Sequence, residues 1–302
     1  MPELPEVETI RVGLAARIVG RRVTRVEVGR ERTVRRTSRD AVIDRLTGCT
    51  FTGANRRGKY LVLPLDSGDA VMVHLRMSGQ LLLAAAGATR PNHTHVVAHL
   101  APAAPASPPN ECVSEGGLDT HPASRIGEEL WFVDPRTFGE VVVFDPDRDP
   151  PEIPELARLG VDPLADPFDA AVLSELLKGR GRQLKALLLD QHVIAGLGNI
   201  YADEVLHAAR LHPMRLATTL KRADVARLAE SISTILRDAV RAGGSTLGDA
   251  QYVDLMGSGG SYQDNHCVYG RGGEPCRSCG RAVITRMMHG GRSTHFCPIC
   301  QK

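Results

Sequence analysis

The chain has 302 residues, of which 42% are hydrophobic and 24% are charged. This length suffices for about two domains of ordinary size. The sequence contains no apolar run of the roughly 18 residues that a membrane-spanning helix needs, and its acidic, proline-containing start differs from a secretory signal. These features exclude an integral membrane protein and predict a cytoplasmic one.

The net charge of +2 conceals an uneven distribution. Residues 1–60 carry 14 Lys or Arg against 7 Asp or Glu, residues 61–178 carry 7 against 18, and residues 179–302 carry 16 against 10. The two ends of the chain therefore have net charges of +7 and +6, and the middle has −11. Basic regions of this kind favour a polyanion such as nucleic acid as the partner.

The first half of the sequence predicts one helix and then an antiparallel β-domain. Val7, Ile10, Leu14 and Ile18 have helical spacing, and Pro5 suits the first turn of such a helix. The strand-like segments that follow are 23–28, 60–65, 71–75, 80–83, 96–100, 130–133 and 141–144. Few helical patterns lie between them, so a sandwich or barrel is expected. Residues 102–128, rich in Pro, Ala and Ser, are expected to form a surface loop.

The second half is predominantly helical. An acidic, proline-rich stretch at 145–154 indicates the start of an interdomain linker, and the pattern is helical from residue 156 onward. Short helices are predicted at 184–189 and 200–209, separated by the Gly-Leu-Gly-Asn of 196–199. A long amphipathic helix contains Leu228, Ile232 and Ile235 and ends at Gly243.

The last 27 residues contain two Cys-x2-Cys pairs. Cys276 and Cys279 are followed, after seventeen residues, by Cys297 and Cys300. This spacing is typical of one tetrahedral Zn²⁺ held by four thiolates, with the intervening residues forming a hairpin. Because four thiolates leave no open coordination position, the Zn²⁺ is predicted to be structural.

The first residues of the chain include a potential nucleophile. Removal of Met1 would leave Pro2 with a free secondary amine, a nucleophile that forms an iminium with a sugar carbon. The helix that begins at Pro5 brings the positive end of its dipole close by, which disfavours the ammonium form. Glu3 is placed to act as a general acid or base beside this amine.

Short motifs follow one another along nearly the whole chain. They are Met-Pro-Glu-Leu-Pro-Glu-Val-Glu at 1–8, Arg-Gly-Lys-Tyr at 57–60, His-Leu-Arg-Met-Ser-Gly at 74–79, Asp-Pro-Arg-Thr-Phe-Gly at 134–139, Leu-Asp-Gln at 189–191, Gly-Leu-Gly-Asn-Ile-Tyr-Ala-Asp-Glu at 196–204, His-Pro at 212–213, Gly-Gly-Ser-Thr-Leu at 243–247 and Val-Tyr-Gly-Arg at 268–271. Together with the cysteine pairs, this order resembles the formamidopyrimidine-DNA glycosylase family.

The resemblance implies an α+β fold. It consists of an N-terminal antiparallel β-sandwich with flanking helices, a helical domain with a helix–two-turn–helix motif, and a C-terminal zinc-finger β-hairpin. We expect the three parts to occupy residues 1–150, 151–265 and 266–302. The implied activity is that of a bifunctional DNA glycosylase and AP lyase of base excision repair. It would act as a monomer on double-stranded DNA, excising 8-oxoguanine and formamidopyrimidines, with one structural Zn²⁺.

The resemblance also assigns roles to individual residues. Pro2 would form a Schiff base with C1′ of the damaged nucleotide, and Glu3 would transfer protons. Lys59 would serve β-elimination and Arg292 δ-elimination. The damaged base must leave the stack, and the hole would be filled by Met77, Arg136 and Phe138. Further DNA contacts are expected from His74, His93, Arg180, Lys185, Asn199 and Glu204. Asn199 in particular would bind phosphate together with free N–H groups at a helix start.

Two alternatives remain open on the sequence. One is an endonuclease VIII-like glycosylase, which has the same fold and chemistry but prefers oxidised pyrimidines. Leu4-Pro5 and the Met77, Arg136 and Phe138 set favour the purine enzyme. The other is a catalytically inactive DNA-binding relative, against which the presence of Pro2, Glu3 and Lys59 argues.

Overall fold

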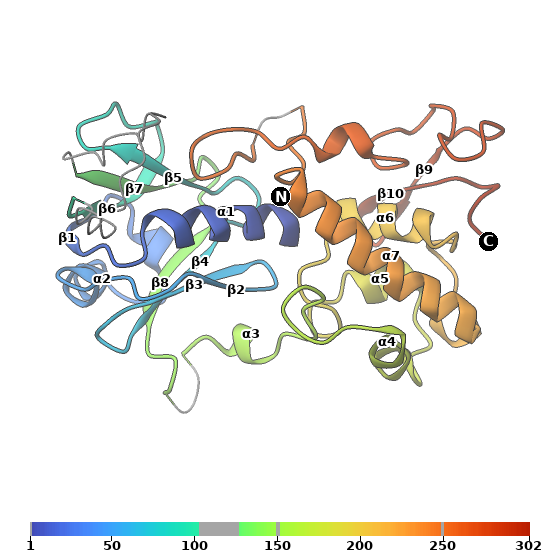
Figure 1. The fold of residues 1–302 in the computed structure, drawn as a ribbon, viewed down its shortest axis with the longest axis horizontal. Helices are drawn as coiled ribbons and strands as arrows, with labels where there is room; N and C mark the ends of the chain where they lie inside the picture. The colour runs from blue at the N-terminus through green and yellow to red at the C-terminus, as the bar shows by residue number, and fades with distance from the viewer. Residues whose placement is uncertain (1, 103–126, 149–151, 249–250) are drawn as a thin grey trace, which may run out of the picture.

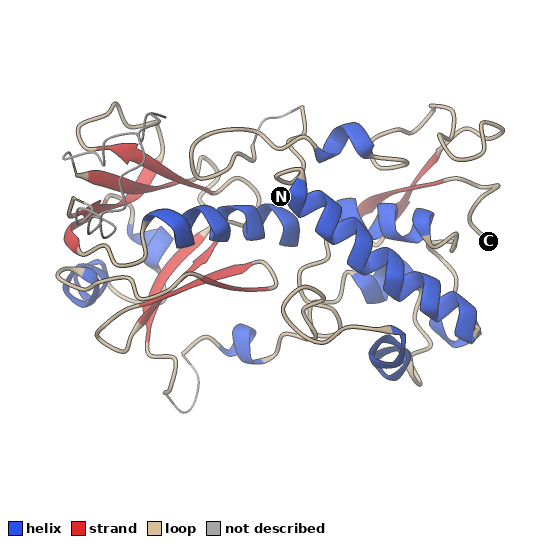
Figure 2. Ribbon diagram, viewed as in Figure 1, coloured by secondary structure: helices blue, strands red, loops and turns tan. Residues whose placement is uncertain are grey.

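The computed structural model describes residues 2–102, 127–148, 152–248 and 251–302. Strands and helices are segregated, with the two β-sheets of the first half at one end of the molecule and most helices at the other (Figure 2). The helix α1 (Leu4–Arg17) runs from the middle of the molecule over the sheets (Figure 1). Most of the loop expected at 102–128 lies outside the described residues.

The predicted antiparallel β-sandwich is confirmed. One sheet has the order β2 (Asn55–Arg57), β3 (Tyr60–Pro64), β4 (Ala70–His74) and β8 (Glu140–Phe144). The other has the order β1 (Val23–Val28), β6 (Thr94–Leu100), β7 (Glu128–Val133) and β5 (Gln80–Ala85). Alternate residues of both sheets, such as Leu61, Val73 and Phe132, form one buried core, as the period of two requires.

Two elements of this half were not predicted from the sequence. They are α2 (Arg39–Leu46) and the short strand β2. In α2 only Val42 and Leu46 are buried, and the remaining positions are mostly polar or charged. In β2 all three residues are polar. The strand β2 has no apolar residue, and the eight residues of α2 are too few to show more than one helical repeat, from Val42 to Leu46. A 3-10 turn, η1 (Glu31–Val34), precedes α2.

The helical half contains α3 (Pro154–Ala157), α4 (Ala170–Leu177), α5 (Leu184–Leu188), α6 (Asn199–Ala208) and α7 (Arg222–Arg241), with 3-10 turns η2 (Ala217–Thr219) and η3 (Tyr262–Asn265). The long helix α7 buries Leu228, Ile232 and Leu236 against α4 and α6, as its amphipathic pattern predicts. The chain ends in a hairpin of β9 (Thr285–His289) and β10 (Arg292–Phe296).

The helix α1 belongs to both halves. Its Val7, Ile10 and Leu14 lie in the core of the sandwich, whereas Leu4, its first residue, lies in the core of the helical half. The start of the chain is therefore held where the two halves meet. In the described part of the chain, no helix is both long enough and apolar enough to cross a membrane.

Candidate active site

The first residues of the chain are buried against the start of α6. Pro2 is buried and Glu3 is 2% exposed. The Glu3 carboxylate accepts hydrogen bonds from the backbone N–H groups of Gly198 at 2.8 Å, Ile200 at 2.9 Å and Tyr201 at 3.3 Å. A side chain at Gly198 would place its Cβ 2.2 Å from the Glu3 carboxyl carbon, so glycine is required there. The N-terminus of α6 thus fixes the residue next to Pro2.

The hydrogen bonds of Glu3 leave fewer free N–H groups beside Asn199 than the sequence suggests. Free N–H groups at this helix start were expected to bind DNA phosphate, but Glu3 already occupies those of Gly198, Ile200 and Tyr201. The Asn199 side-chain amide donates to the carbonyl of Ser293 at 2.9 Å. Asn199 therefore connects α6 to the hairpin, and a phosphate contact from it stays a prediction.

Glu6 is a second buried carboxylate that was not predicted as a site residue. It accepts hydrogen bonds from the backbone N–H of Glu3 at 2.8 Å, the backbone N–H of Ser245 at 2.7 Å and the hydroxyl of Tyr201 at 2.5 Å. Burial and the proximity of Glu3 raise the pKa of Glu6. The sequence signal for it is the capping box, in which an acidic residue three positions after the N-cap binds back to the N-cap backbone.

Lys59 lies close to this pair of carboxylates. It lies in the two-residue turn between β2 and β3 and is 7% exposed. Desolvation lowers the pKa of the Lys59 amine, Glu3 and Glu6 raise it, and Arg292 lowers it further, with a net decrease. The fold therefore brings the predicted nucleophile segment, the elimination lysine and the hairpin arginine within electrostatic reach of one another.

His74, at the end of β4, is buried and uncharged. Its Nδ1 accepts the backbone N–H of Arg76 at 3.0 Å. Desolvation, Arg76 and Lys59 lower the pKa of His74 to about 3. At neutral pH it is thus a hydrogen-bonding group and not a cation, and a phosphate contact from it would have to be a neutral hydrogen bond.

The three residues expected to fill a vacated base position lie together on the surface. Met77 and Phe138 are 42% and 47% exposed, which is unusual for large apolar side chains. The Arg136 guanidinium lies 3.9 Å from the Met77 sulfur. Met77 lies in the loop between β4 and β5, and Arg136 and Phe138 lie in the loop between β7 and β8. Asp134 links these two loops by accepting hydrogen bonds from the Ser78 hydroxyl at 2.6 Å and the Gly139 N–H at 2.7 Å. This is an exposed apolar wedge with a cation beside it.

Three of the four non-glycine residues with positive φ in the described chain lie in these two loops and in the loop before β6. Arg76, Thr137 and the exposed His93 have φ values of 54°, 56° and 67°, in the left-handed region. Such a conformation is costly for residues other than glycine and is most unusual for a β-branched one. Residues in strained loops cluster at functional sites, and these flank the predicted wedge.

Lys185 and Glu204 are both buried, and a DNA contact from either stays a prediction. The Lys185 side chain is fully buried, pairs with Asp203 at 2.7 Å and donates to the Ser293 carbonyl at 2.9 Å. A direct DNA contact would require it to leave this pair. Glu204 is 3% exposed and accepts the backbone N–H groups of residues 267–269 at 2.7–2.9 Å. Both residues fix the hairpin and the segment before it onto the helical half.

Arg180 and Arg292 are exposed, as predicted for cations that contact DNA. Arg292 opens β10 and borders a cavity of 250 Å³ together with Arg182 and His289. Arg182 is paired with Asp190 at 2.6 Å. The contacts of Lys185 and Asn199 with Ser293 hold the residue that follows Arg292, so the direction of the hairpin is fixed from α5 and α6.

The four cysteines form the predicted metal site. Their Sγ atoms all lie within 4.8 Å of one another, with 3.9 Å between Cys276 and Cys300 and 3.8 Å between Cys279 and Cys297. Four sulfurs at about 2.3 Å from one Zn²⁺ in a tetrahedron would be about 3.8 Å apart. The site fits one structural Zn²⁺ and leaves no position open for catalysis.

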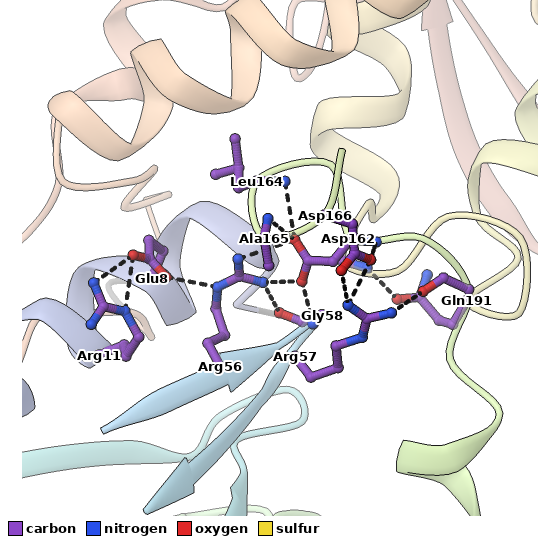
Figure 3. Close-up of polar contacts among 12 residues, drawn as sticks. Glu8, Arg11, Arg56, Arg57, Gly58, Asp162, Leu164, Ala165, Asp166 and Gln191 are labelled. Atoms are coloured by element: carbon purple, nitrogen blue, oxygen red, sulfur yellow. Dashed lines mark hydrogen bonds and ion pairs between the residues drawn. The ribbon is translucent and has the colours of Figure 1, made fainter. Parts of the chain in front are cut away.

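A network of ion pairs joins the turn before Lys59 to the helical half (Figure 3). Arg56 binds Asp162, and Arg57 binds Asp166 at 2.6 Å and the carbonyl of Gly160 at 3.0 Å. Glu8, Arg57 and Gly58 of this network lie in the motifs named above, whereas Arg56, Asp162 and Asp166 lie outside them. The acidic residues come from the loop that follows α3.

Comparison with known proteins agrees along the whole chain. Residues 1–141 match the formamidopyrimidine-DNA glycosylase N-terminal domain, residues 159–251 the H2TH domain of the same enzymes, and residues 273–302 the zinc finger found in FPG and IleRS. Formamidopyrimidine-DNA glycosylases of Gluconobacter oxydans and Salinispora arenicola are 41% and 42% identical, with this chain covered completely and 100% and 96% of theirs. A Lactococcus lactis Fpg variant solved in complex with Fapy-dG-containing DNA is 35% identical, with a TM-score of 0.84 and complete coverage of both chains.

The fold and the site define a DNA glycosylase of base excision repair with a helix–two-turn–helix domain and a zinc finger. The chain belongs to the formamidopyrimidine-DNA glycosylase family.

Proposed function

We propose that this chain excises oxidised purines from double-stranded DNA and then cleaves the strand as an AP lyase, acting as a monomer. The observation that carries the proposal is the fixation of Glu3, and hence of Pro2, at the start of α6, with Lys59 in electrostatic reach. The relatives named above and the Lactococcus lactis complexes with Fapy-dG-containing and abasic-site DNA support the substrate class. Membership of a DNA repair family supports a cytoplasmic location, and the predicted boundaries at residues 150 and 265 stay part of this proposal.

The chemistry uses the amine that removal of Met1 exposes. The Pro2 nitrogen attacks C1′ of the damaged nucleotide, the bond from C1′ to the base breaks, and the base leaves with a proton. The sugar ring then opens: the C1′–O4′ bond breaks, O4′ takes up a proton, and C1′ and the Pro2 nitrogen form the iminium, which acidifies the hydrogen on C2′. Loss of that proton expels the 3′ phosphate, and a second proton loss expels the 5′ phosphate. Glu3 is assigned the proton transfers of sugar opening, Lys59 the first elimination, and Arg292 phosphate binding during the second.

The wedge residues are assigned to the DNA itself. Met77, Phe138 and Arg136 would occupy the space of the extruded nucleotide, where the exposed apolar side chains replace its stacking and the guanidinium bonds the unpaired base. His74, His93 and Arg180 are assigned contacts with the DNA backbone. Lys185, Asn199 and Glu204 stay proposed DNA contacts. In the chain without DNA, Lys185 and Asn199 hold the hairpin that presents Arg292, and Glu204 holds the segment before it.

Borohydride reduction tests the nucleophile. On DNA with an abasic site, the wild-type chain is expected to form a covalent adduct upon reduction, and Pro2→Gly is expected to form much less, because its primary amine is a weaker nucleophile than the pyrrolidine nitrogen. Gel electrophoresis of the cross-linked complex measures both. A wild-type chain without an adduct, or a Pro2→Gly variant that forms it equally well, contradicts the Schiff-base proposal.

A panel of damaged duplexes tests the base preference. We expect 8-oxoguanine and formamidopyrimidines to be released faster than thymine glycol. Faster release of thymine glycol would instead indicate the endonuclease VIII-like preference.

The elimination step is expected to depend on pH through Lys59. Its pKa lies below the ordinary value of 10.5, and the neutral amine is the form that accepts a proton. Strand cleavage at an abasic site should therefore increase with pH, with a midpoint below 10.5. Because Arg292 lowers the pKa of Lys59, Arg292→Gln should move this midpoint to higher pH. Identical midpoints in the two proteins, measured as single-turnover cleavage rates, would contradict the assignment.

A further inference from the structure

We propose that the buried pair of Arg56 and Asp162 positions Lys59 for strand cleavage, by tying the turn that carries Lys59 to both α1 and the helical half of the molecule. The proposal rests on the elimination role given to Lys59 above. Neither Arg56 nor Asp162 lies where it would touch DNA, since their side chains are 3% and 0% exposed.

Asp162 binds the turn at two points. Its Oδ2 accepts the Arg56 Nη1 at 2.5 Å and the backbone N–H of Gly58 at 2.7 Å, and its Oδ1 accepts the Arg56 Nη2 at 3.1 Å. The Arg56 Nη1 also donates to the carbonyl of Gly58 at 2.9 Å. Both backbone polar groups of the residue directly before Lys59 are thus held by this pair (Figure 3).

The Asp162 carboxylate is also hydrogen-bonded within its own loop. The Asp162 Oδ1 accepts the backbone N–H groups of Leu164 and Ala165 at 3.1 and 3.2 Å. The backbone N–H of Gly160, at the start of the same loop, donates to the carbonyl of Gln191 at 2.9 Å. These hydrogen bonds attach the loop to the helical half. The position of Asp162, and with it the position of the turn that carries Lys59, therefore depends on that half.

The turn then packs against the segment that holds the nucleophile. Gly58 has φ of 55°, and a Cβ there would lie 3.2 Å from the Cβ of Ala195. The next residue, Gly196, accepts the backbone N–H of Leu4 at 3.0 Å. Asp162 is therefore connected to the start of the chain through Gly58 and the short loop that contains Ala195 and Gly196.

Arg56 completes the connection on the other side. Its Nε donates to the Oε2 of Glu8 at 2.8 Å, and the Oε1 of Glu8 binds Arg11. Glu8 lies in α1, the helix that also carries Glu6 and is capped by Glu3. One guanidinium thereby joins α1, the Lys59 turn and the helical half, which is what a positioning residue for Lys59 has to do.

The test removes both charges together, because removal of one would leave the other buried and unpaired. The double variant Arg56→Met with Asp162→Leu is expected to fold and to keep its Zn²⁺. On abasic-site DNA, its borohydride adduct should form within about threefold of the wild-type rate, whereas cleavage of the strand should fall by about 10- to 100-fold, the range expected for a catalytic group misplaced by an ångström or less. Adding Lys59→Gln to the double variant should cause no further loss, since the misplaced lysine no longer contributes.

The matched control is Arg45→Met with Asp69→Leu. This Arg–Asp pair is also bidentate, at 2.6 and 2.8 Å, but it lies entirely within the sheet domain. It is expected to cleave at the wild-type rate. If the Arg56 and Asp162 double variant does not fold, Asp162→Asn keeps an acceptor for Gly58 and should lose part of the cleavage rate.

Three outcomes would overturn the proposal. They are wild-type cleavage by the variants at Arg56 and Asp162, an equal loss of adduct formation and cleavage, and a full additional loss upon Lys59→Gln. Failure of the proposed function is a different result, because the wild-type chain itself would then form no adduct.

Discussion

Replacement of Glu3 by glutamine is expected to slow base excision by roughly 10²- to 10⁴-fold, the usual contribution of a positioned acid–base group. Glutamine has the same shape but transfers no proton. It also presents an NH₂ group where the carboxylate accepts N–H groups from Gly198, Ile200 and Tyr201. One donor would then face another donor, at a cost of about 1–3 kcal/mol in folding free energy.

The two effects of Glu3→Gln are separable. Single-turnover release of 8-oxoguanine measures excision, and denaturant unfolding measures the loss of stability. DNA that already contains an abasic site is the internal comparison, because its base is gone and its sugar can open to the aldehyde without the enzyme, so the variant should lose less there. Excision at the wild-type rate would contradict the role given to Glu3.

Loss of the metal is expected to have the second large effect. Without Zn²⁺ the thiolates of Cys276, Cys279, Cys297 and Cys300 no longer hold the hairpin, since sites of this kind are folded by their metal. Its contacts with the helical half would be lost with it, among them Asn199 to Ser293 at 2.9 Å and His295 N–H to Asp203 at 2.8 Å. Arg292 would lose its fixed position, and the affinity for DNA should fall by at least about 10-fold, because a hydrogen bond to a charged group contributes roughly 1.5–3 kcal/mol.

Cys297→Ser and treatment with a chelator should give the same result. Zinc content, near-ultraviolet circular dichroism and binding to an uncleavable abasic-site duplex measure it. Cys49→Ser is the matched control, because Cys49 is partly buried and distant in sequence from the metal site. Among the described contacts, its thiol donates a hydrogen bond only to the Arg45 carbonyl. Unchanged DNA affinity in the metal-free chain would contradict the prediction.

The fold was largely predictable because its signals are local. Alternating apolar residues gave the strands of the sandwich, helical spacing gave α1 and α7, and the cysteine spacing gave the metal site, all of which are confirmed. Of the elements that were missed, β2 has only polar residues, and half of the residues in α2 are charged. Their stability comes from tertiary contacts that no local pattern records.

The supporting side chains were less predictable, for a physical reason. The family resemblance identified Lys185, Asn199 and Glu204 as functional residues. The sequence does not distinguish a charged or amide side chain that contacts DNA from one that binds a neighbouring backbone. The structure buries Lys185 against Asp203 and directs Glu204 to three N–H groups. Arg56 and Asp162 were missed because their pairing depends on residues 106 positions apart.

The position of α1 has a consequence for how the chain holds together. Its first residue, Leu4, completes the helical core, and its later turns complete the core of the sandwich. Glu3 in turn caps the backbone of α6. A helical domain separated from the first residues would have a gap in its interior and uncapped N–H groups, and a sandwich without α1 would have an open apolar face. The two domains are therefore coupled in folding, and local opening of one exposes the interior of the other.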